Sequence, residues 1–432
     1  VPTGASSSFG GDFTRASGSH FYKSGDGTQY ITSDITGIGG TTFINGGTLS
    51  LGNGGGAGFL DSNTVINAAG NLTFDQARSF SFDTGRLSGT GTLTKEGSGN
   101  LTLIGSSGHS GPVIINDGTV TLNSRTAIES VSPVTVNSGG ILQLNGQIVE
   151  LASLDGAGLI LFSDNVNDFY RDFWTVPGKL TVGSDDADSV FTGGLASKYW
   201  TYSDGSTFEV VNFGTFEKVG TGTLEIDTEE FGPTWIIISA GTLKLGAGNI
   251  LENDQRVSLS SGATLDITTE GESFGGLDGT GGMVRMGASN LTVGGDNTAR
   301  TYAGGLNNFT DADDDTLAPS PGDFIKTGGQ LFTIEGDLAT NLVNFTGDFE
   351  IQNGGLALSP SDGVTYSIAG SRLRGTGNLR QSGAGTLTIV DGPNDLSGNF
   401  IVLEGSTLGF EVTSGETVSI ASDRFRDAGT LQ

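Results

Sequence analysis

The sequence predicts an all-β fold, a parallel β-helix in which short strands stack coil upon coil. A Gly-rich turn followed by Thr-Leu-x-Leu keeps returning, as GGTLSL at Gly46, DGTVTL at Asp117, AGTLKL at Ala240 and NGGLALS at Asn353. Most apolar runs are short and are bounded by Gly, Asn, Asp or Ser, which is typical of β-strands. Helical periodicity is nearly absent, and the best helical candidate is the short stretch Ala196–Tyr202. Recurring phrases of this kind indicate one supersecondary unit stacked on itself.

The amino-acid composition and charge limit which kinds of partner this protein can bind. The chain has 432 residues, of which 74 are glycine and none is cysteine, and its 48 acidic residues outnumber 20 basic ones, for a formal charge of −28. This charge disfavours nucleic acids and anionic membrane surfaces as partners, because binding to both requires basic patches. No apolar stretch is long enough for a transmembrane helix, so we expect no direct membrane insertion by this segment. Because the chain opens on Val1 without a charged-then-apolar leader, we expect a mature or excised segment.

The smaller repeat is about 20 residues long. One circuit leads from Leu101–Leu103 to Val120–Leu122, with a Ser-Gly-rich turn between. Inward Leu, Ile and Val at period two would form ladders, and Thr, Ser and Asn would face outward. An antiparallel β-sandwich is the alternative, because Asn-Gly at Asn45 and Asp-Gly at Asp117 are hairpin signals. Both lie at the same point of the repeat, however, and this favours a corner between coil faces.

The longer repeat exceeds a hundred residues. LDGAG at Leu154 returns as LDGTG at Leu277, and LTVGSDD at Leu180 returns as LTVGGDN at Leu291. A Lys-x-Gly phrase ending in alternating Leu or Ile occurs at Lys95, Lys218 and Lys326, and with Gln in place of Lys at Gln381. Downstream partner phrases are SGPVII at Ser110, FGPTWII at Phe231, TGDFEI at Thr346 and SGNFIV at Ser397.

This ordered set resembles the passenger-associated repeats of Gram-negative autotransporters. The order is LxGxG, the Lys-x-Gly phrase, a phrase of the SGPVII type and GTLxL, and it covers most of residues 40–410. The resemblance implies a right-handed parallel β-helix that is exported and displayed at the cell surface. Three insertions, at 163–175, 197–216 and 307–323, depart from the compact family pattern. Residues 1–38 lack the repeat phrases and contain several aromatic side chains, which predicts a cap-like segment before the repeats of 39–432.

No catalytic residue is predicted. The two histidines, His20 and His109, have no partner at metal-ligand or triad spacing and are expected to be exposed in turns. No cofactor is predicted, and calcium is the one ion with weak candidates. They are the acidic residues of two clusters: Asp185, Asp186 and Asp188, and Asp311, Asp313 and Asp315. Neither cluster has the glycine or the distal glutamate of an EF-hand loop, so solvated acidic loops are the preferred interpretation.

Aromatic residues are concentrated in the first two inserts. The interaction candidates among them are Phe169, Tyr170, Trp174, Tyr199 and Trp200. They could form a sugar-stacking or protein-binding face, since exposed aromatic patches mark interaction sites. They could instead fill a small satellite core that holds the inserts to the repeats, and this interpretation is favoured.

The sequence thus predicts a non-enzymatic, extracellular surface rod with a structural or adhesive role on a Gram-negative cell. Its partners would be a cell-surface or matrix protein, a glycan, or another copy of the chain. A filament or surface-layer subunit joined head to tail is one alternative, because the chain stops within a GTLxL phrase at Gln432. A polysaccharide-degrading enzyme on a β-helix is the other, and it would require a carboxylate-lined groove.

Overall fold

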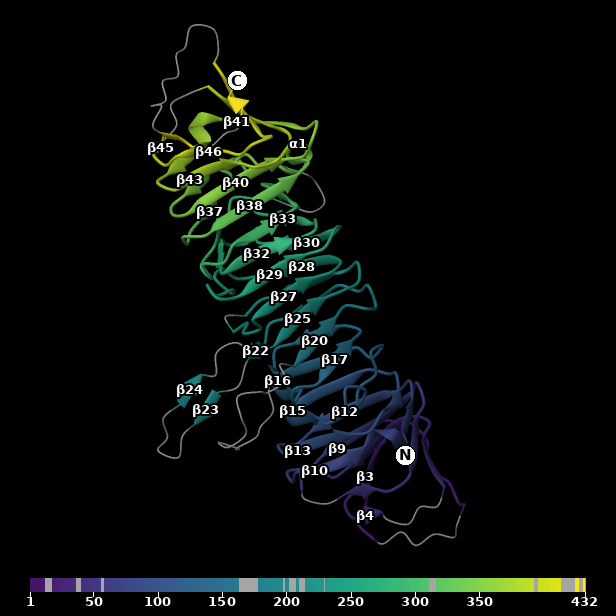
Figure 1. Ribbon diagram of the computed structural model, residues 1–432. Coiled ribbons are helices and arrows are strands. Elements are labelled where there is room, and N and C mark those ends of the chain that lie inside the picture. Colours follow the sequence, from purple (N-terminus) through teal and green to yellow (C-terminus); the bar gives the residue numbers. More distant parts are fainter. Residues whose placement is uncertain are drawn as a thin grey trace. The chain divides into compact units, whose positions relative to one another are not determined.

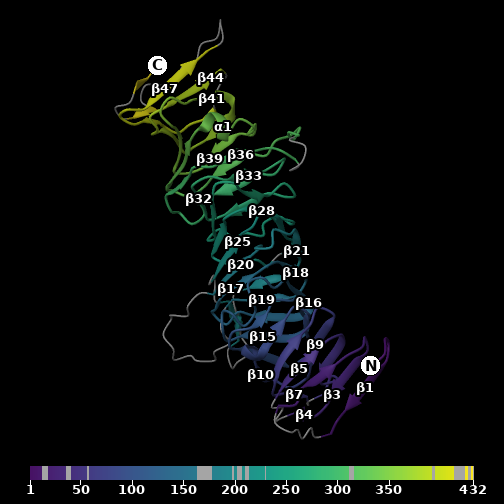
Figure 2. The ribbon, with the colours of Figure 1, turned by 90° about the vertical axis from the view of Figure 1, so that its right-hand side faces the viewer.

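The computed structural model describes residues 1–11, 18–35, 40–55, 58–162, 178–196, 199–201, 207–209, 214–228, 230–310, 316–391, 395–412, 424–426 and 430–431. The chain divides into two compact units, Val1–Pro233 (unit 1) and Thr234–Gln432 (unit 2). Within each unit, short strands pair in parallel with the strands one coil away (Figure 1 and Figure 2). The described residues form about 17 turns of an all-β parallel β-solenoid, which confirms the predicted fold class. Its right-handed sense stays a prediction.

Unit 1 contains strands β1 to β26. One sheet of this unit comprises β1 (Ser6–Phe9), β3 (Thr28–Ile31), β6 (Gly47–Leu51), β9 (Gly70–Asp75), β10 (Phe80–Asp83), β12 (Thr92–Glu96), β13 (Asn100–Ile104), β15 (Val113–Leu122), β16 (Val134–Gln143), β18 (Leu154–Gly156), β19 (Leu159–Leu161), β21 (Ser189–Phe191), β22 (Gly194–Ala196) and β26 (Thr223–Ile226). A second comprises β2 (Phe21–Lys23), β5 (Thr41–Ile44), β8 (Asn63–Ile66), β11 (Leu87–Gly89) and β14 (Gly108–His109). A third comprises β17 (Ile148–Leu151), β20 (Lys179–Val182) and β25 (Thr215–Lys218). Two short pairs are β4 (Asp34–Ile35) with β7 (Phe59–Leu60), and β23 (Tyr199–Thr201) with β24 (Thr207–Glu209).

Unit 2 contains strands β27 to β49. Its strands form four groups. The first comprises β28 (Gly241–Leu245), β30 (Ala263–Asp266), β33 (Met283–Arg285) and β36 (Gly305–Asn307). The second comprises β27 (Trp235–Ile238), β29 (Arg256–Leu259), β32 (Gly276–Gly279), β35 (Arg300–Tyr302), β38 (Leu331–Gly336), β40 (Gly355–Pro360), β43 (Asn378–Gln381), β46 (Phe400–Val402) and β48 (Phe425–Arg426). The third comprises β31 (Glu272–Phe274), β34 (Leu291–Val293), β37 (Phe324–Lys326), β39 (Phe349–Ile351), β42 (Leu373–Gly375) and β45 (Asp395–Leu396), and the fourth comprises β41 (Thr365–Ala369), β44 (Thr386–Val390), β47 (Thr407–Glu411) and β49 (Thr430–Leu431). The helices of the described residues are one α-turn, α1 (Leu338–Asn341), and two 3₁₀ turns, η1 (Thr84–Arg86) and η2 (Gly370–Arg372).

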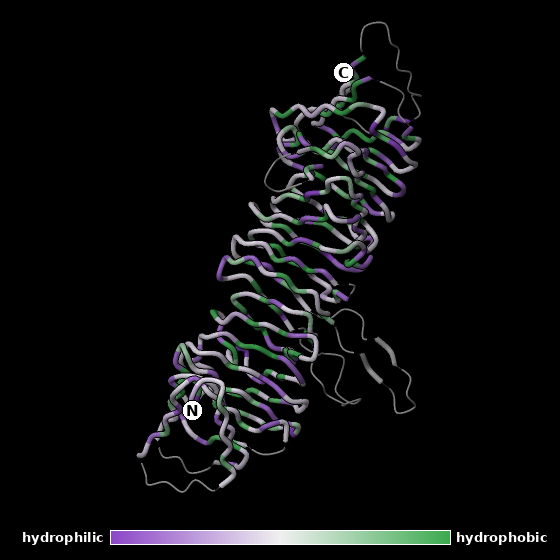
Figure 3. The backbone as a smooth tube through the Cα atoms, turned by 180° about the vertical axis from the view of Figure 1, so that it is seen from behind, coloured by the Kyte–Doolittle hydropathy of each residue, from purple (hydrophilic) through white to green (hydrophobic). Residues whose placement is uncertain are grey.

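The core is a set of inward ladders. In unit 1, Leu72, Leu93, Val113, Val134 and Leu154 pair in register along five successive coils, and all five are buried. Buried apolar residues alternate with less buried polar ones along strands such as β26 and β29 (Figure 3), as the period-two pattern predicts. Burying each such side chain stabilises the fold by about 1.5–3 kcal/mol relative to exposure. The ladders therefore supply the hydrophobic energy that a thin core needs.

The Asn-Gly and Asp-Gly signals lie at corners between coil faces. After Asn45 and Gly46, β5 and β6 follow one another in the chain, yet each pairs in parallel with strands of other coils. Asp117 and Gly118 lie inside β15, which pairs in parallel with β16. The sandwich alternative is therefore wrong, and the corner interpretation is confirmed.

The structure covers parts of the predicted cap and inserts. The segment 1–38 contributes β1, β2 and β3, which pair in parallel with strands of the same sheets as the repeats. The insert 163–175 lies outside the described residues. In the insert 197–216, β23 and β24 form an antiparallel pair, so the helical candidate is wrong over residues 199–201. In the insert 307–323, an antiparallel bridge joins Phe309 to Leu317.

Candidate functional site

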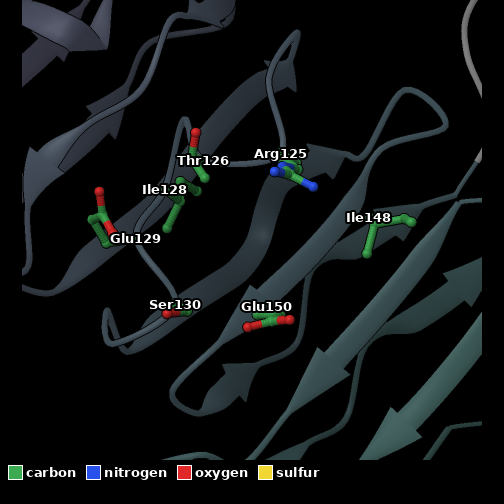
Figure 4. A pocket seen from close by; sticks show the side chains of 7 residues that line it. All are labelled: Arg125, Thr126, Ile128, Glu129, Ser130, Ile148 and Glu150. Carbon is green, nitrogen blue, oxygen red and sulfur yellow. The ribbon is translucent and has the colours of Figure 1, made fainter.

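A hollow of about 240 Å³ lies in unit 1, between β17 and the irregular turn that connects β15 to β16. Figure 4 shows the turn residues on one side and two residues of β17 on the other. The lining residues are Arg125, Thr126, Ile128, Glu129, Ser130, Ile148 and Glu150. The turn takes the place that a strand occupies in neighbouring coils, so the hollow marks an interruption of the strand ladder.

The hollow adjoins an open strand edge. Lys179 N donates to Gln147 O at 3.1 Å and Gly183 N donates to Leu151 O at 3.3 Å, so these carbonyls face β20. Because backbone groups alternate along a strand, the N–H and C=O groups of Ile148 and Glu150 point the other way, toward the turn. Within the described part of the chain, no hydrogen bond joins the turn to these four groups. They remain available to water or to an extended peptide segment.

The hollow is lined by charged and hydrogen-bonding groups. Arg125 and the open edge offer donors, and the carboxylates of Glu129 and Glu150 offer acceptors, with a net charge of one negative unit. Among the described residues, the hydroxyl hydrogen bonds of its lining join Thr126 Oγ1 to Ser106 Oγ at 2.8 Å and to Ser124 Oγ at 3.3 Å. Neither partner is a base, so these bonds do not activate a nucleophile.

The first acidic cluster caps the backbone of the next coil. Asp186 Oδ1 accepts a hydrogen bond from Thr221 N at 2.6 Å, and Asp188 Oδ1 accepts one from Thr223 N at 2.7 Å. Asp185 Oδ1 accepts one from Ala187 N at 3.1 Å. The bond from Thr221 lowers the pKa of the Asp186 carboxyl. Each of the three carboxylates thus accepts a hydrogen bond from a different backbone amide, and the structure does not group them around a common point.

The longer sequence repeat has a structural counterpart at this turn. Asn297, at the position that matches Asp186, accepts a hydrogen bond from Gly329 N at 2.7 Å. Both residues have left-handed backbone conformations, with φ of 59° for Asp186 and 51° for Asn297. Asp and Asn tolerate this conformation better than other side chains with a Cβ. The two LTVG turns therefore perform the same capping role in their respective units.

The other predicted residues are covered only in part. Asp311, Asp313, Asp315, Phe169, Tyr170 and Trp174 lie outside the described residues. Tyr199 and Trp200 lie in β23, opposite Glu209 and Phe208 of β24. Among the residues that the structure describes, no three His, Asp or Glu side chains are grouped as a metal ion would need.

The expectation of two exposed histidines is wrong at His109. Its side chain is buried, and Nε2 lies 2.7 Å from Gly91 O, so this nitrogen carries the proton and donates. Burial lowers the pKa of the His109 imidazole. His20 is exposed, and its Nδ1 accepts a hydrogen bond from Thr41 N at 3.0 Å.

Sequence reasoning missed the role of the lysine in the Lys-x-Gly phrase. Lys95, Lys218 and Lys326 are at most 3% exposed. Lys95 Nζ donates to the carbonyls of Glu96, Gly97 and Asp117, the last of which lies in the next coil. The signal was present in the sequence, because each lysine follows an inward apolar residue by two positions. Period two therefore places it inward.

The glutamine of the fourth phrase performs the same function. Gln381 is buried, and its Nε2 donates to Gly385 O at 2.8 Å and to Gly383 O at 3.3 Å. Its Oε1 accepts a hydrogen bond from Gly383 N at 3.1 Å. A neutral amide can thus satisfy a coil corner that a buried ammonium satisfies elsewhere.

We expect the stability of unit 2 to depend on pH through Lys326. Burial lowers the pKa of its ammonium from 10.5 to about 8. Between these values the unfolded chain retains a proton that the folded state has lost, so the free energy of unfolding should rise with pH from 8 to 10.5. The measurement is chemical denaturation of the native chain and of Lys326→Gln across this pH range. The contribution of Lys326 is the difference between their two free energies of unfolding.

Subtracting the free energy of unfolding of Lys326→Gln from that of the native chain cancels the contributions of the other titrating groups. Burial raises the pKa of Tyr366 to about 12 and that of Tyr302 as well, so both tyrosines lower stability at high pH in the native chain and in the variant alike. An unchanged difference between pH 8 and 10.5 would contradict the assignment to Lys326.

Comparison with known proteins finds a family repeat at the coil corners that contain buried lysines. Residues 21–51 and 93–122 match the passenger-associated-transport-repeat. This chain carries passenger-associated transport repeats. Each match begins at or just before a buried lysine phrase, at Lys23 and Lys95, and ends on a GTLxL strand. Lys23 Nζ donates to Gly25 O at 2.6 Å and to Gly46 O at 2.7 Å, as Lys95 does across its own repeat. The lysine bridge between coils is thus part of the passenger-associated repeat in this chain.

The repeat-bearing chain is also similar to a curated protein, the Adhesin BmaC autotransporter of Brucella suis biovar 1 (strain 1330). The two are 29% identical over 215 residues, which is 47% of this chain and 6% of the relative. The chain therefore corresponds to a small part of that relative's length. No solved structure matches the chain. No helix in the described residues has the length and apolar character that crossing a membrane requires.

Proposed function

We propose that this chain is part of a non-enzymatic autotransporter passenger, displayed at the surface of a Gram-negative cell, with a structural or adhesive role. The observation that carries the proposal is the passenger-associated repeat, matched in sequence and built around buried lysines that join successive coils. The similarity to a protein named as an adhesin supports the adhesive role.

The scaffold suits display of a binding surface. Its side chains stand on parallel strands whose backbone groups are bonded to the coils on either side, so outward groups have fixed positions. Rigid elements hold binding groups more accurately than loops do. The partner we propose is a molecule of a host or neighbouring cell surface, either a matrix protein or a glycan.

Adhesion can be tested with the purified chain coupled to beads. We expect these beads to bind cultured epithelial cells or plates coated with matrix protein or mucin several-fold more than albumin-coated beads do. Soluble chain added in excess should compete. Binding no greater than that of albumin on all of these surfaces would contradict the adhesive role, and the structural role would then be preferred.

A further inference from the structure

A polar hollow of about 500 Å³ lies on the outer face of three neighbouring strands of unit 2, namely β29, β32 and β35. This volume falls within the range of about 300–1,000 Å³ that is typical of small-ligand sites. Its polar lining includes Arg256, Ser258, Asp278, Thr280, Arg300 and Thr301. Together with Trp235 and Asp296, which contact these residues, we call this surface the Trp235 groove.

Gly276 lies beneath the guanidinium of Arg300, which lines the groove. Register places Trp235 opposite Arg256, and Arg256 opposite Gly276. A Cβ added at Gly276 would lie 2.6 Å from Arg300 Nε and 2.8 Å from Asp296 Oδ2. The missing side chain therefore gives the Arg300 guanidinium room to lie across β32, and any larger residue would displace it.

The charged groups form a balanced network. Arg256 pairs with Asp278 through two nitrogens, and its Nη2 lies 3.0 Å from Oδ1. Arg300 Nη1 lies 3.4 Å from Asp278 Oδ2, and Arg300 Nε lies 3.1 Å from Asp296 Oδ2. Two arginines and two aspartates leave no net charge here, on a chain whose formal charge is −28. The groove is thus set apart from an otherwise acidic protein, and it offers no excess charge to a charged ligand.

Hydrogen-bonding capacity remains after the network is formed. Within the described part of the chain, the hydroxyls of Ser258, Ser260, Thr280 and Thr301 have no hydrogen-bond partner, and neither has Nη1 of Arg256. Trp235 is 38% exposed, with the Arg256 guanidinium 4.7 Å from the ring centroid. Pockets of this kind orient a ligand through a few fixed polar groups beside an apolar surface.

We propose that the Trp235 groove binds a neutral glycan. A sugar ring offers hydroxyls that both donate and accept, which matches free hydroxyls and guanidinium N–H groups. It also offers a flat C–H face to an exposed indole, which is apolar in body and polar at one edge. The balanced charges favour an uncharged chain over a uronate or sialylated one. This inference rests on the proposed adhesive function and names the ligand class of one of its surfaces.

Calorimetric titration of the full chain tests the proposal with six neutral oligosaccharides: cellohexaose, maltohexaose, laminarihexaose, mannohexaose, xylohexaose and chitohexaose. We expect at least one to bind at millimolar concentration or below. Trp235→Ala and Gly276→Ala should each weaken that binding about tenfold, as loss of a central contact does. Tyr22→Ala is the matched control, because it removes an exposed aromatic side chain in unit 1.

The outcomes separate this inference from the adhesive function. Binding that falls in both groove variants and is retained in Tyr22→Ala supports the groove. Three results would overturn it: no binding to any of the six sugars, binding that both groove variants retain, or binding only to a charged oligogalacturonate. If Trp235→Ala beads still adhere to cells as native beads do, the adhesive function stands and the groove is not its site.

Discussion

Replacing Lys95 by methionine is expected to lower the free energy of unfolding of unit 1 by about 3–5 kcal/mol, because it removes the donor from three part-buried carbonyls. Lys95 Nζ donates to Glu96 O at 2.6 Å, to Asp117 O at 3.1 Å and to Gly97 O. Each buried acceptor left unpaired costs about 1–3 kcal/mol. Methionine matches the apolar stem of lysine up to Cε, so the loss reflects mainly the ammonium and not the packing.

Two further variants identify the cause. Lys95→Gln should lower the free energy of unfolding by only about 1 kcal/mol, the typical net contribution of one hydrogen bond. The reason is that the Gln381 amide donates to the corner carbonyl of Gly385 at the equivalent position. Lys179→Met is the control, since Lys179 is only partly buried, pairs with the carboxylate of Glu217 and bridges no coil corner; its loss should cost at most about 1 kcal/mol. Chemical denaturation followed by circular dichroism measures all three. A Lys95→Met loss no larger than that of Lys179→Met would show that the corner carbonyls are satisfied without the ammonium.

Replacing Gly279 by alanine is the second large effect, with an expected loss of about 3–5 kcal/mol in unit 2, from backbone strain and overpacking together. Gly279 is the central glycine of LDGTG, with φ of +144°, a conformation that side chains with a Cβ rarely adopt. A Cβ there would lie 2.1 Å from Leu259 O on the neighbouring strand. The methyl group fits only if β32 moves away from the paired strand β29.

Gly363→Ala separates the two contributions. Gly363 also has a positive φ, +75°, but nothing lies within 4 Å of an added Cβ, so only strain of about 1 kcal/mol is expected. The thermal midpoint of unit 2 should therefore fall much further for Gly279→Ala than for Gly363→Ala. Equal shifts in the two variants would mean that the close approach to Leu259 does not determine the glycine of this phrase.

The matching glycine in unit 1 has the same geometry. Gly156 of LDGAG has φ of +108°, and a Cβ there would lie 2.2 Å from Val136 O. A phrase that reads only as a pattern in the sequence is thus a steric requirement of stacked coils, since the turn between two faces passes directly over the backbone of the neighbouring coil.

The sequence by itself determined the fold class, the coil repeat and the inward ladders. Period-two alternation and glycine-bounded runs are local properties, so residues such as Leu93, Val113 and Val134 could be assigned to the core before any coordinates were known. Turn chemistry did the same for the corners that follow Asn45 and Asp117, where Gly47 and Gly118 have positive φ, because a positive φ is a local requirement.

The tertiary structure alone decided which polar groups meet. Lys95 reaches Asp117 in the next coil, and Trp235 and Arg256 share a surface only because their strands are in register. Such contacts depend on the length of every coil between them, and turns and inserts change that length. Desolvation and hydrogen bonding then decide whether a lysine is buried as a bridge or exposed as a charge, and both depend on neighbours that are distant in sequence.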